Sequence, residues 1–248
     1  MKYLYFDIFA SFSPVMAASS VVDMLKSEDE FKAFSLLFGG YDSDIKEVRR
    51  QSMEATLVTF CPFEEKTFKY GELISLCGGL SLSQGVKDKL CLFIKILSEA
   101  KAFDVQDAEF KANEILPNLI SSAYVFKKTE ELDTQKVYVP RVFTRETLPM
   151  LEMSECEYIV KKYGIKTECT DIDVPLFSKY GAAFLSVCRP EFSLPPSPLP
   201  IKIGYGAGED DIKEVPNILR TVYGESDEEE KLFMGGAEFE EIFHAVEA

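Results

Sequence analysis

Histidine is almost absent from this chain of 248 residues, which contains a single one, His244. A Ser-His-Asp catalytic triad would have to use that residue, close to the C-terminal end of the sequence. A zinc site built from several imidazole ligands is excluded. The histidine count therefore limits the acid–base and metal chemistry that the chain can perform with its own side chains.

Long apolar runs and paired cysteines are also missing. No segment approaches the roughly 18 consecutive apolar residues that a membrane-spanning helix needs. The first apolar run is broken by Asp7, which favours a first strand over a signal peptide. The cysteines form no CxxC pair and have wide spacings, which predicts reduced thiols in a cytoplasmic protein. They are Cys61, Cys77, Cys91, Cys156, Cys169 and Cys188.

Positive charge is scarce, with 27 Lys and Arg against 42 Asp and Glu and a net charge of −15. Nucleic acid is therefore disfavoured as a main partner, because Lys and Arg drive the binding of its phosphates. Anionic membrane surfaces are disfavoured for the same reason. Residues 225–248 hold nine acids and one Lys, a net of −8, so the other 224 residues carry only −7.

Strands alternate with helices along the chain, which predicts an α/β or α+β fold with a layered mixed sheet and flanking helices. The nearly unbroken apolar run 3–9 predicts a central N-terminal strand. A helix over 107–126 is expected to kink or break at Pro117, and the proline-rich stretch 190–200 is expected to be a stiff connector. Further strands are predicted at 53–60, 136–143, 165–169 and 218–223, and helices at 15–26, 28–38, 72–77, 84–101, 155–163 and 178–187.

Asp7 lies at the end of the predicted first strand. Ligands of α/β sheets bind beyond the carboxyl ends of strands, where an aspartate can hold a metal or a ligand hydroxyl. The alternative is an N-cap or Asx turn at the start of the following segment. A carboxylate inside an apolar run is costly unless something pairs with it, so a partner for Asp7 is expected under either interpretation.

The second candidate is the glycine cluster 204–208, made of Gly204, Tyr205, Gly206, Ala207 and Gly208. Three glycines in five residues permit positive φ, and successive N–H groups can form an anion-binding nest. The acids at 209–211 follow directly and would repel a phosphate unless a metal intervened. On spacing alone, a structural turn is favoured over such a nest. The cluster is neither a Walker A loop nor a dinucleotide-binding fingerprint. Further along, Asn217 can cap or turn the chain, and Arg220 can pair with an acid.

The C-terminal segment combines acidity with an apolar stripe. Phe239, Ile242, Phe243 and Val246 follow helical spacing, which predicts an amphipathic helix docked on this chain or on a partner. The domain boundaries that follow are an α/β domain over 1–225 and an acidic tail over 226–248. The sequence is compatible with a protein partner bound through this tail and with a homo-oligomer.

The glycine cluster, together with Asp211, the run 216–220 and Gly224-Glu225, resembles the closing signature of the LarC-type nickel-insertion proteins. The opening Leu4-Tyr5-Phe6-Asp7, followed by Phe9, Ser13 and Met16, is similar to the first strand and turn of that family. Residues 80–83, the helix to Lys101 and the run 181–183 occur in the expected order, so the resemblance covers residues 1–225.

The resemblance implies a function. The family inserts nickel into a pyridinium bis-thiocarboxylate mononucleotide, using CTP, to make the cofactor of lactate racemase and related enzymes in the cytoplasm. Full-length members carry a further C-terminal domain that binds the nucleotide with a divalent metal, and we expect this chain to lack it. The positions implied for ligand binding are Asp7, Gly204, Tyr205, Gly206, Gly208, Asn217 and Arg220, with Asp7 and Glu114 as ligands of nickel or another divalent metal.

The histidines of the family pattern are missing. Where a His-x-His-Glu motif is expected the chain reads Lys-Ala-Asn-Glu at 111–114, so only Glu114 matches. A histidine pair expected before the helix at 72 is replaced by Phe68 and Lys69. Because nickel is well served by imidazole and thiolate ligands, these losses predict a divergent paralogue, a scaffold that binds a ligand or partner without autonomous nickel-chelatase activity. The alternative is an active metal-insertion component completed by a separate nucleotide-binding subunit.

Overall fold

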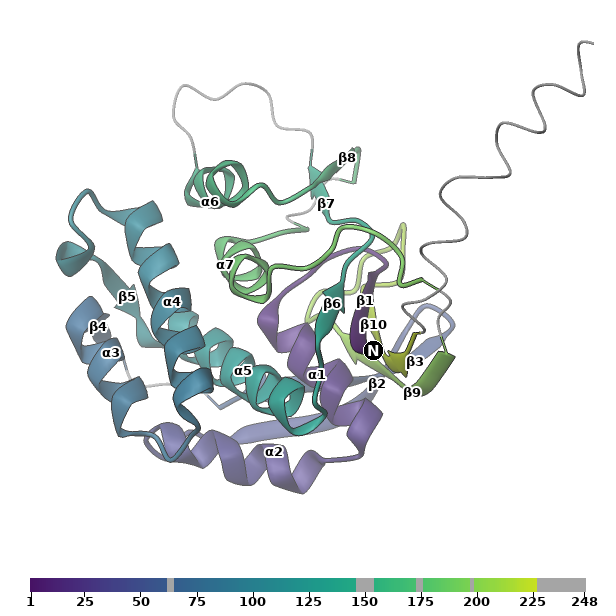
Figure 1. Cartoon of the computed structure of the whole chain (residues 1–248), viewed down its shortest axis with the longest axis horizontal. Coiled ribbons are helices and arrows are strands. Elements are labelled where there is room, and N and C mark those ends of the chain that lie inside the picture. Colours follow the sequence, from purple (N-terminus) through teal and green to yellow (C-terminus); the bar gives the residue numbers. More distant parts are fainter. Residues whose placement is uncertain (62–64, 146–153, 173–175, 197–198, 227–248) are drawn as a thin grey trace, which may run out of the picture.

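The computed structural model describes residues 1–61, 65–145, 154–172, 176–196 and 199–226, and it shows a mixed six-stranded sheet with helices packed against it (Figure 1). The strand order is β2-β3-β9-β10-β1-β6. The pairs β1–β6 and β3–β9 are parallel, and the other neighbours are antiparallel. This confirms the predicted α/β class. The strands are β1 (Lys2–Ile8), β2 (Ser43–Arg50), β3 (Met53–Phe60), β6 (Lys136–Tyr138), β9 (Leu199–Ala207) and β10 (Ile218–Glu225).

The helices lie to the left of the sheet in Figure 1, with α1 between the strands and α5. They are α1 (Pro14–Leu25), α2 (Glu28–Ser35), α3 (Tyr70–Gly79), α4 (Gln84–Lys101), α5 (Ala112–Glu131), α6 (Glu155–Tyr163) and α7 (Lys179–Cys188), with short 3-10 turns η1 (Leu36–Phe38) and η2 (Val105–Asp107). Two small ribbons pair β4 (Thr67–Lys69) with β5 (Glu109–Lys111) and β7 (Phe143–Arg145) with β8 (Glu168–Thr170). Within the described residues, no helix combines the length and the apolar character needed to cross a membrane.

Strand β1 is central, as its apolar sequence predicts, because β10 pairs with one edge and β6 with the other. Leu4, Phe6 and Ile8 are buried in the main core beneath the helices. The alternate residues, including Tyr5 and Asp7, point to the other face of the sheet. Asp7 therefore lies on the face opposite the helical core.

Glycines let α1 approach the sheet closely. A Cβ on Gly204 would lie 2.6 Å from the Met24 Cβ, and a Cβ on Gly206 would lie 2.6 Å from the Ser20 amide nitrogen. Strand β9 runs straight through the cluster to Ala207, so the structural turn considered for it is wrong. None of Gly204, Gly206 and Gly208 has the positive φ seen at Gly39, Gly40 and Gly164. The cluster instead makes a close helix–strand contact, which sequence spacing alone does not distinguish from a turn.

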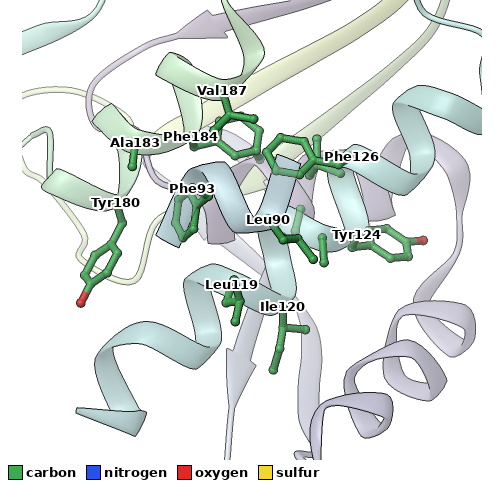
Figure 2. Packing of buried hydrophobic residues seen from close by; sticks show 14 of the residues in the cluster. Leu90, Phe93, Leu119, Ile120, Tyr124, Phe126, Tyr180, Ala183, Phe184 and Val187 are labelled. Atoms are coloured by element: carbon green, nitrogen blue, oxygen red, sulfur yellow. The ribbon is translucent and has the colours of Figure 1, made fainter. Parts of the chain in front are cut away.

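The main core joins α4, α5 and α7 around aromatic side chains (Figure 2). Phe126 of α5 stacks on Phe184 of α7, with ring centroids 5.2 Å apart and planes inclined by 7°. Leu90 and Phe93 of α4 are fully buried in the same cluster. Burying one such side chain contributes roughly 1.5–3 kcal/mol, so this cluster fixes the helical layer against the inner face of the sheet.

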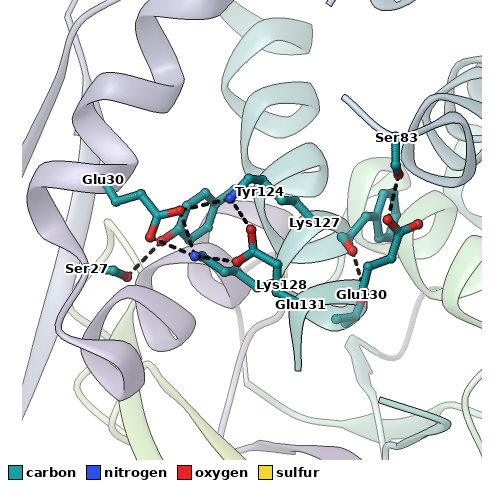
Figure 3. Close-up of polar contacts among 10 residues, drawn as sticks. Ser27, Glu30, Ser83, Tyr124, Lys127, Lys128, Glu130 and Glu131 are labelled. Atoms are coloured by element: carbon teal, nitrogen blue, oxygen red, sulfur yellow. Dashed lines mark hydrogen bonds and ion pairs between the residues drawn. The ribbon is translucent and has the colours of Figure 1, made fainter. Parts of the chain in front are cut away.

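An ionic network ties α2 to α5 (Figure 3). The Lys128 ammonium is largely buried and lies 2.7 Å from carboxylate oxygens of both Glu30 and Glu131. Burial opposes the charge of Lys128, but the hydrogen bonds that its ammonium donates to Glu131 and Glu30 outweigh this effect, so the pKa of Lys128 is raised. Beside it the Tyr124 hydroxyl donates to the Ser27 Oγ at 2.7 Å. The network stabilises a helix contact far from the cavity described below.

Several local predictions differ from the structure, including the strands expected at 136–143 and 165–169, which are found at 136–138 and 168–170. Helix α5 continues unbroken past Pro117, its sixth residue, although the proline removes one N–H donor from the helix interior. The helix also begins at Ala112 rather than 107, because 109–111 pair with β4. Strand β2, rich in charged residues, gave no apolar signal and forms by pairing with β3. The amphipathic helix predicted from 239 to 246 lies outside the described residues.

Candidate functional site

A cavity of about 340 Å³ lies beyond the carboxyl ends of β1 and β9. This is where ligands of α/β sheets bind. Its walls come from the segment after β1, the loop between β9 and β10, and the first turns of three helices. Polar lining residues are Ser11, Ser13, Asn113, Glu114, Asn118, Ser178, Tyr180, Glu209, Asp210 and Asn217, and the others are Val15, Met16, Leu57, Pro117, Ala207 and Gly208.

Helices α1, α5 and α7 all begin at this cavity. Ser13 caps α1, its Oγ accepting from the Met16 amide at 3.2 Å. Ser178 caps α7 in the same way, accepting from the Gly181 amide at 3.4 Å. The first turn of a helix leaves N–H groups without intrahelical partners and carries partial positive charge. The cavity therefore lies at the partly positive ends of three helices, where the Met16 and Gly181 amides are already bonded to their capping serines.

Asn217 organises the loop that closes the cavity. Its Oδ1 accepts from the Ser11 Oγ at 2.5 Å, and its Nδ2 donates to the Asp210 carbonyl at 2.9 Å. A Cβ on Gly208 would lie 2.7 Å from the Asn217 Cγ, so glycine is needed at that position. Asn217 thus holds the β9–β10 loop against the segment after β1.

The charges lining the cavity are all negative. Glu114, Glu209 and Asp210 contribute carboxylates, and no Lys, Arg or His is among the described residues that line it. The nearby Lys111 ammonium lies 3.9 Å from the Glu114 carboxylate, on an exposed surface. Hydroxyl and amide groups make up most of the remaining polar lining. Such a lining suits neutral or cationic groups, whereas an anion would need the helix N–H donors or an added cation.

Tyr180 is buried at the cavity, with 8% of its surface exposed. Its hydroxyl points away from the labelled apolar side chains of Figure 2 and has no partner in regular hydrogen-bond geometry. Burial raises the pKa of Tyr180, and the negative charges of Glu114 and Glu155 raise it further. The phenol is therefore a neutral group at physiological pH, facing a carboxylate.

Asp7 has a different partner. The Arg220 Nη2 donates to its Oδ2 at 2.5 Å, across the antiparallel pair β1–β10. The Arg220 guanidinium also lies 5.8 Å from the centre of the Phe9 ring. Burial raises the pKa of Tyr5 to about 12, and the charge and hydrogen bonding of Asp7 add to the effect. These residues lie on the outer face of the sheet. Arg220 is the partner that the sequence predicted for Asp7.

The residues predicted for the site therefore fall into separate places. Glu114, Gly208 and Asn217 line the cavity. Asp7, Tyr205 and Arg220 lie on the outer face of the sheet, while Gly204 and Gly206 pack against α1. Sequence reasoning missed Ser11, Asn118 and Tyr180, because nothing in their local spacing shows that they line the same cavity as Asn217.

Potential metal ligands are dispersed. Among the residues the structure describes, no three His, Cys, Asp or Glu side chains gather as a metal site would require. All six cysteines are free thiols. Burial raises the pKa of Cys77 to about 12 and of Cys156 to about 11, which disfavours the thiolate that binds metals.

The sequence also matches a known family. A family model described as nickel insertion protein matches residues 4–238. The chain belongs to the nickel insertion protein family. The resemblance found in the glycine cluster and the first strand is confirmed.

Curated relatives agree with this assignment. A protein of Syntrophobacter fumaroxidans named "Putative nickel insertion protein" is 25% identical over 239 residues, 91% of this chain and 61% of its own length. A pyridinium-3,5-bisthiocarboxylic acid mononucleotide nickel insertion protein of Desulfitobacterium hafniense is 23% identical over 246 residues, 93% of this chain and 60% of its own. The chain thus spans about three fifths of the length of these relatives. No solved structure matches it.

Proposed function

We propose that this chain is a divergent nickel insertion family member, a ligand-binding scaffold that does not insert nickel by itself. The observation that carries the proposal is the donor set at the cavity. The described lining offers carboxylates, hydroxyls and amides, with no imidazole and no thiol. Nickel is well served by imidazole and thiolate, and the single histidine, His244, lies outside the described residues.

The charge of the cavity supports the same conclusion. The name of the Desulfitobacterium relative specifies a pyridinium bisthiocarboxylic acid mononucleotide, whose thiocarboxylates and phosphate are negative at neutral pH. The carboxylates of Glu114, Glu209 and Asp210 would repel such groups, and no cationic side chain lines the described cavity to offset them. A neutral or cationic small molecule fits this lining better.

The alternative function is a metal-insertion component completed by a separate nucleotide-binding subunit. The first turns of α1, α5 and α7 at the cavity favour it, since their N–H groups can receive an anion. Glu114, at the third position of α5, would then supply a metal ligand beside those donors. A partner would have to bring the remaining ligands and the cationic groups.

Nickel binding by the purified full chain tests the proposal. Isothermal titration calorimetry with Ni²⁺ should show no site of sub-micromolar affinity, and His244→Ala serves as the control for adventitious binding by the one imidazole. A sub-micromolar site present in both proteins would overturn the proposal. Weak binding lost in the His244→Ala variant would agree with it.

An insertion assay separates the two functions. The full chain is mixed with nickel, CTP and the pyridinium substrate, alone and with a nucleotide-binding partner subunit, and metallated product is measured by mass spectrometry. We expect no product from the chain alone. Product formed only with the partner would establish the alternative, and product formed by the chain alone would refute the proposal.

A further inference from the structure

The side of the cavity formed by α5 and α7 is rich in hydrogen-bond acceptors. Asn113, Glu114, Asn118 and Tyr180, here called the α5–α7 wall, all line the cavity. The Asn118 Nδ2 donates to the Glu114 carbonyl at 2.9 Å, which directs its Oδ1 away from that carbonyl as an acceptor. Pro117 follows Asn113 by four positions in α5, and it has no N–H to donate to the Asn113 carbonyl. Together with the Glu114 carboxylate, these oxygens can receive the donors of a ligand.

The Tyr180 hydroxyl is a second feature of this wall that points to a ligand. It is shielded from solvent, and within the described residues no hydrogen bond of regular geometry reaches it. A polar atom shielded from water destabilises the folded state unless it is paired. Burial raises the pKa of this phenol, and the charge of Glu114 beside it adds to the effect. The neutral hydroxyl can donate to Glu114 and still accept a hydrogen bond from a group that enters the cavity.

The balance of charge at this wall favours a cation. The Lys111 ammonium contacts the Glu114 carboxylate only at 3.9 Å, and such an exposed pair is weak. Lys179, next to Tyr180, is already paired with Glu155 at 2.7 Å. The N-termini of α1, α5 and α7 contribute roughly half a positive charge each, which is less than the charge of the three carboxylates that line the cavity. The Glu114 charge is therefore available to a cationic ligand.

The donor set favours an organic cation over a metal ion. Ca²⁺ takes roughly six to eight oxygen ligands and Mg²⁺ demands octahedral coordination, whereas no three metal-binding side chains gather among the residues that the structure describes. One carboxylate matches one positive charge, and an ammonium group has three N–H donors for the oxygens around it. The cavity of about 340 Å³ is at the lower end of the roughly 300–1,000 Å³ of small-molecule pockets.

From these observations we infer that the cavity binds the primary ammonium group of a small organic amine at the α5–α7 wall. Glu114 pairs with the positive charge. The Tyr180 hydroxyl accepts one N–H while it donates to Glu114, and the Asn118 Oδ1 accepts another. The inference rests on the proposed function, which assigns the cavity to a neutral or cationic molecule, and it adds the charged group and the residues that select it.

An amine titration of the isotope-labelled full chain, followed by NMR, tests the inference. Propylammonium chloride is the probe, and the backbone amides of 113–118 and 178–181 are observed. We expect saturable shifts at millimolar concentrations, because so small a molecule has few atoms with which to bind. Tetramethylammonium has the same charge without an N–H donor, and 1-propanol has a donor without the charge. Each should bind at least about tenfold more weakly than propylammonium.

Three variants locate the binding site. Glu114→Gln should weaken propylammonium binding at least about tenfold, because it removes the charge that pairs with the ammonium. Tyr180→Phe should weaken it at least about threefold through the loss of one hydrogen bond. Glu109→Gln is the matched control, since Glu109 is also an exposed carboxylate 3.9 Å from a lysine, Lys69, and it should leave the affinity unchanged. Circular dichroism confirms that each variant keeps the fold.

The result that supports the inference is saturable binding that both wall variants weaken and Glu109→Gln retains. Absence of saturable shifts at the wall overturns it, as does binding that Glu114→Gln leaves unchanged. Equal binding of tetramethylammonium, or tighter binding of Mg²⁺ at the same amides, also overturns it. Nα-acetyl-lysine amide represents the lysine of a protein partner, and if it binds more tightly than propylammonium, the small-molecule occupant is wrong.

The nickel titration described above keeps this inference separable from the proposed function. A chain that binds neither nickel nor propylammonium refutes the inference and leaves the proposed function standing. A sub-micromolar nickel site overturns the proposed function, whatever the amine titration shows.

Discussion

Asp7 and Arg220 face each other across β1 and β10, and the Arg220 Nη2 donates to the Asp7 Oδ2 at 2.5 Å. Asp7 and Arg220 match the family pattern near opposite ends of the sequence, and here each neutralises the charge of the other. The Asp7 side chain is 14% exposed and that of Arg220 is 37% exposed, so the pair lies at the border between core and solvent. Asp7 and Arg220 therefore form a structural ion pair on the outer face of the sheet.

Replacing Asp7 by Asn tests the structural role of this pair. The variant leaves the Arg220 charge without its partner, and we expect a loss of about 1–2 kcal/mol in unfolding free energy, less than the 3–5 kcal/mol of a fully buried pair because Arg220 is partly solvated. Urea denaturation measures it. Asp133→Asn, in an exposed pair with Lys2, should change stability by less than about 0.5 kcal/mol. Equal effects in the two variants would contradict the assignment.

Gly206→Ala probes the contact between α1 and β9. The new Cβ would overlap the Met16 carbonyl and lie 2.6 Å from the Ser20 amide nitrogen, both in backbone that cannot yield easily. We expect a loss of about 1–3 kcal/mol from overpacking. Gly78→Ala is the control, because nothing lies within 4 Å of its Cβ in α3; it should be neutral or stabilising by up to about 1 kcal/mol. A neutral Gly206→Ala would show that α1 does not pack this closely.

Much of the fold was predictable from local pattern. The strand 53–60 and the helix 155–163 have the predicted bounds, because β-branched content and capping residues act over a few neighbours. The glycine cluster was not assigned correctly, since the reason for its glycines is the distant backbone of α1. Strand β2 was missed because pairing with β3, and not its own apolar content, makes it a strand.

The site was predictable only in part, for a related reason. The rule that ligands bind beyond strand ends pointed to the edge of the sheet at which the cavity lies, and Glu114, Gly208 and Asn217 line that cavity. Ser11 and Asn217 are 206 residues apart in sequence, so no spacing argument could join them. Asp7 was judged from its place at a strand end, while the side of the sheet it faces depends on register with β10.

Tyr180→Phe tests whether the buried phenol serves the folded state or a ligand. Because the hydroxyl is buried without a partner in regular geometry, removing it should leave stability unchanged or raise it by up to about 1 kcal/mol. Thermal denaturation of wild type and variant measures the change. Tyr124→Phe provides the contrast, since it removes a hydrogen bond to Ser27 and should cost about 1 kcal/mol. A comparable loss in Tyr180→Phe would mean that its hydroxyl already stabilises the fold.

The network around Lys128 predicts a pH dependence of stability. Burial works against the Glu30 and Glu131 charges, but hydrogen bonds from Lys127 and Lys128 lower the pKa of both carboxyls below the usual 4.5. Their contribution is therefore complete above about pH 5 and is lost as the pH falls through the lowered values. The raised pKa of Lys128 means that its own contribution is complete below the usual 10.5 and is lost at still higher pH.

Lys128→Met should therefore flatten the acid limb of the stability curve. At pH 7 we expect a loss of about 1–2 kcal/mol, modest because both carboxylates are nearly half exposed and can be hydrated. The measurement is urea unfolding at several pH values between 7 and 3. Lys95→Met, in an exposed pair with Glu99 at 4.0 Å, should leave the pH dependence intact. A wild-type slope preserved in Lys128→Met would show that other carboxyls dominate acid unfolding.

Thiol reactivity should follow burial. Cys61 and Cys169 are exposed, whereas Cys77 is fully buried and its pKa is raised to about 12, chiefly by burial. Because the thiolate is the reactive form, a chromogenic disulfide reagent at pH 8 should titrate Cys61 and Cys169 first and reach Cys77 only when the chain unfolds. Peptide mapping of the labelled protein identifies the sites, and denaturant supplies the six-thiol endpoint. Rapid labelling of Cys77 in the native protein would show that α3 opens from the core. It would also mean that this thiol is accessible enough to act as a metal ligand.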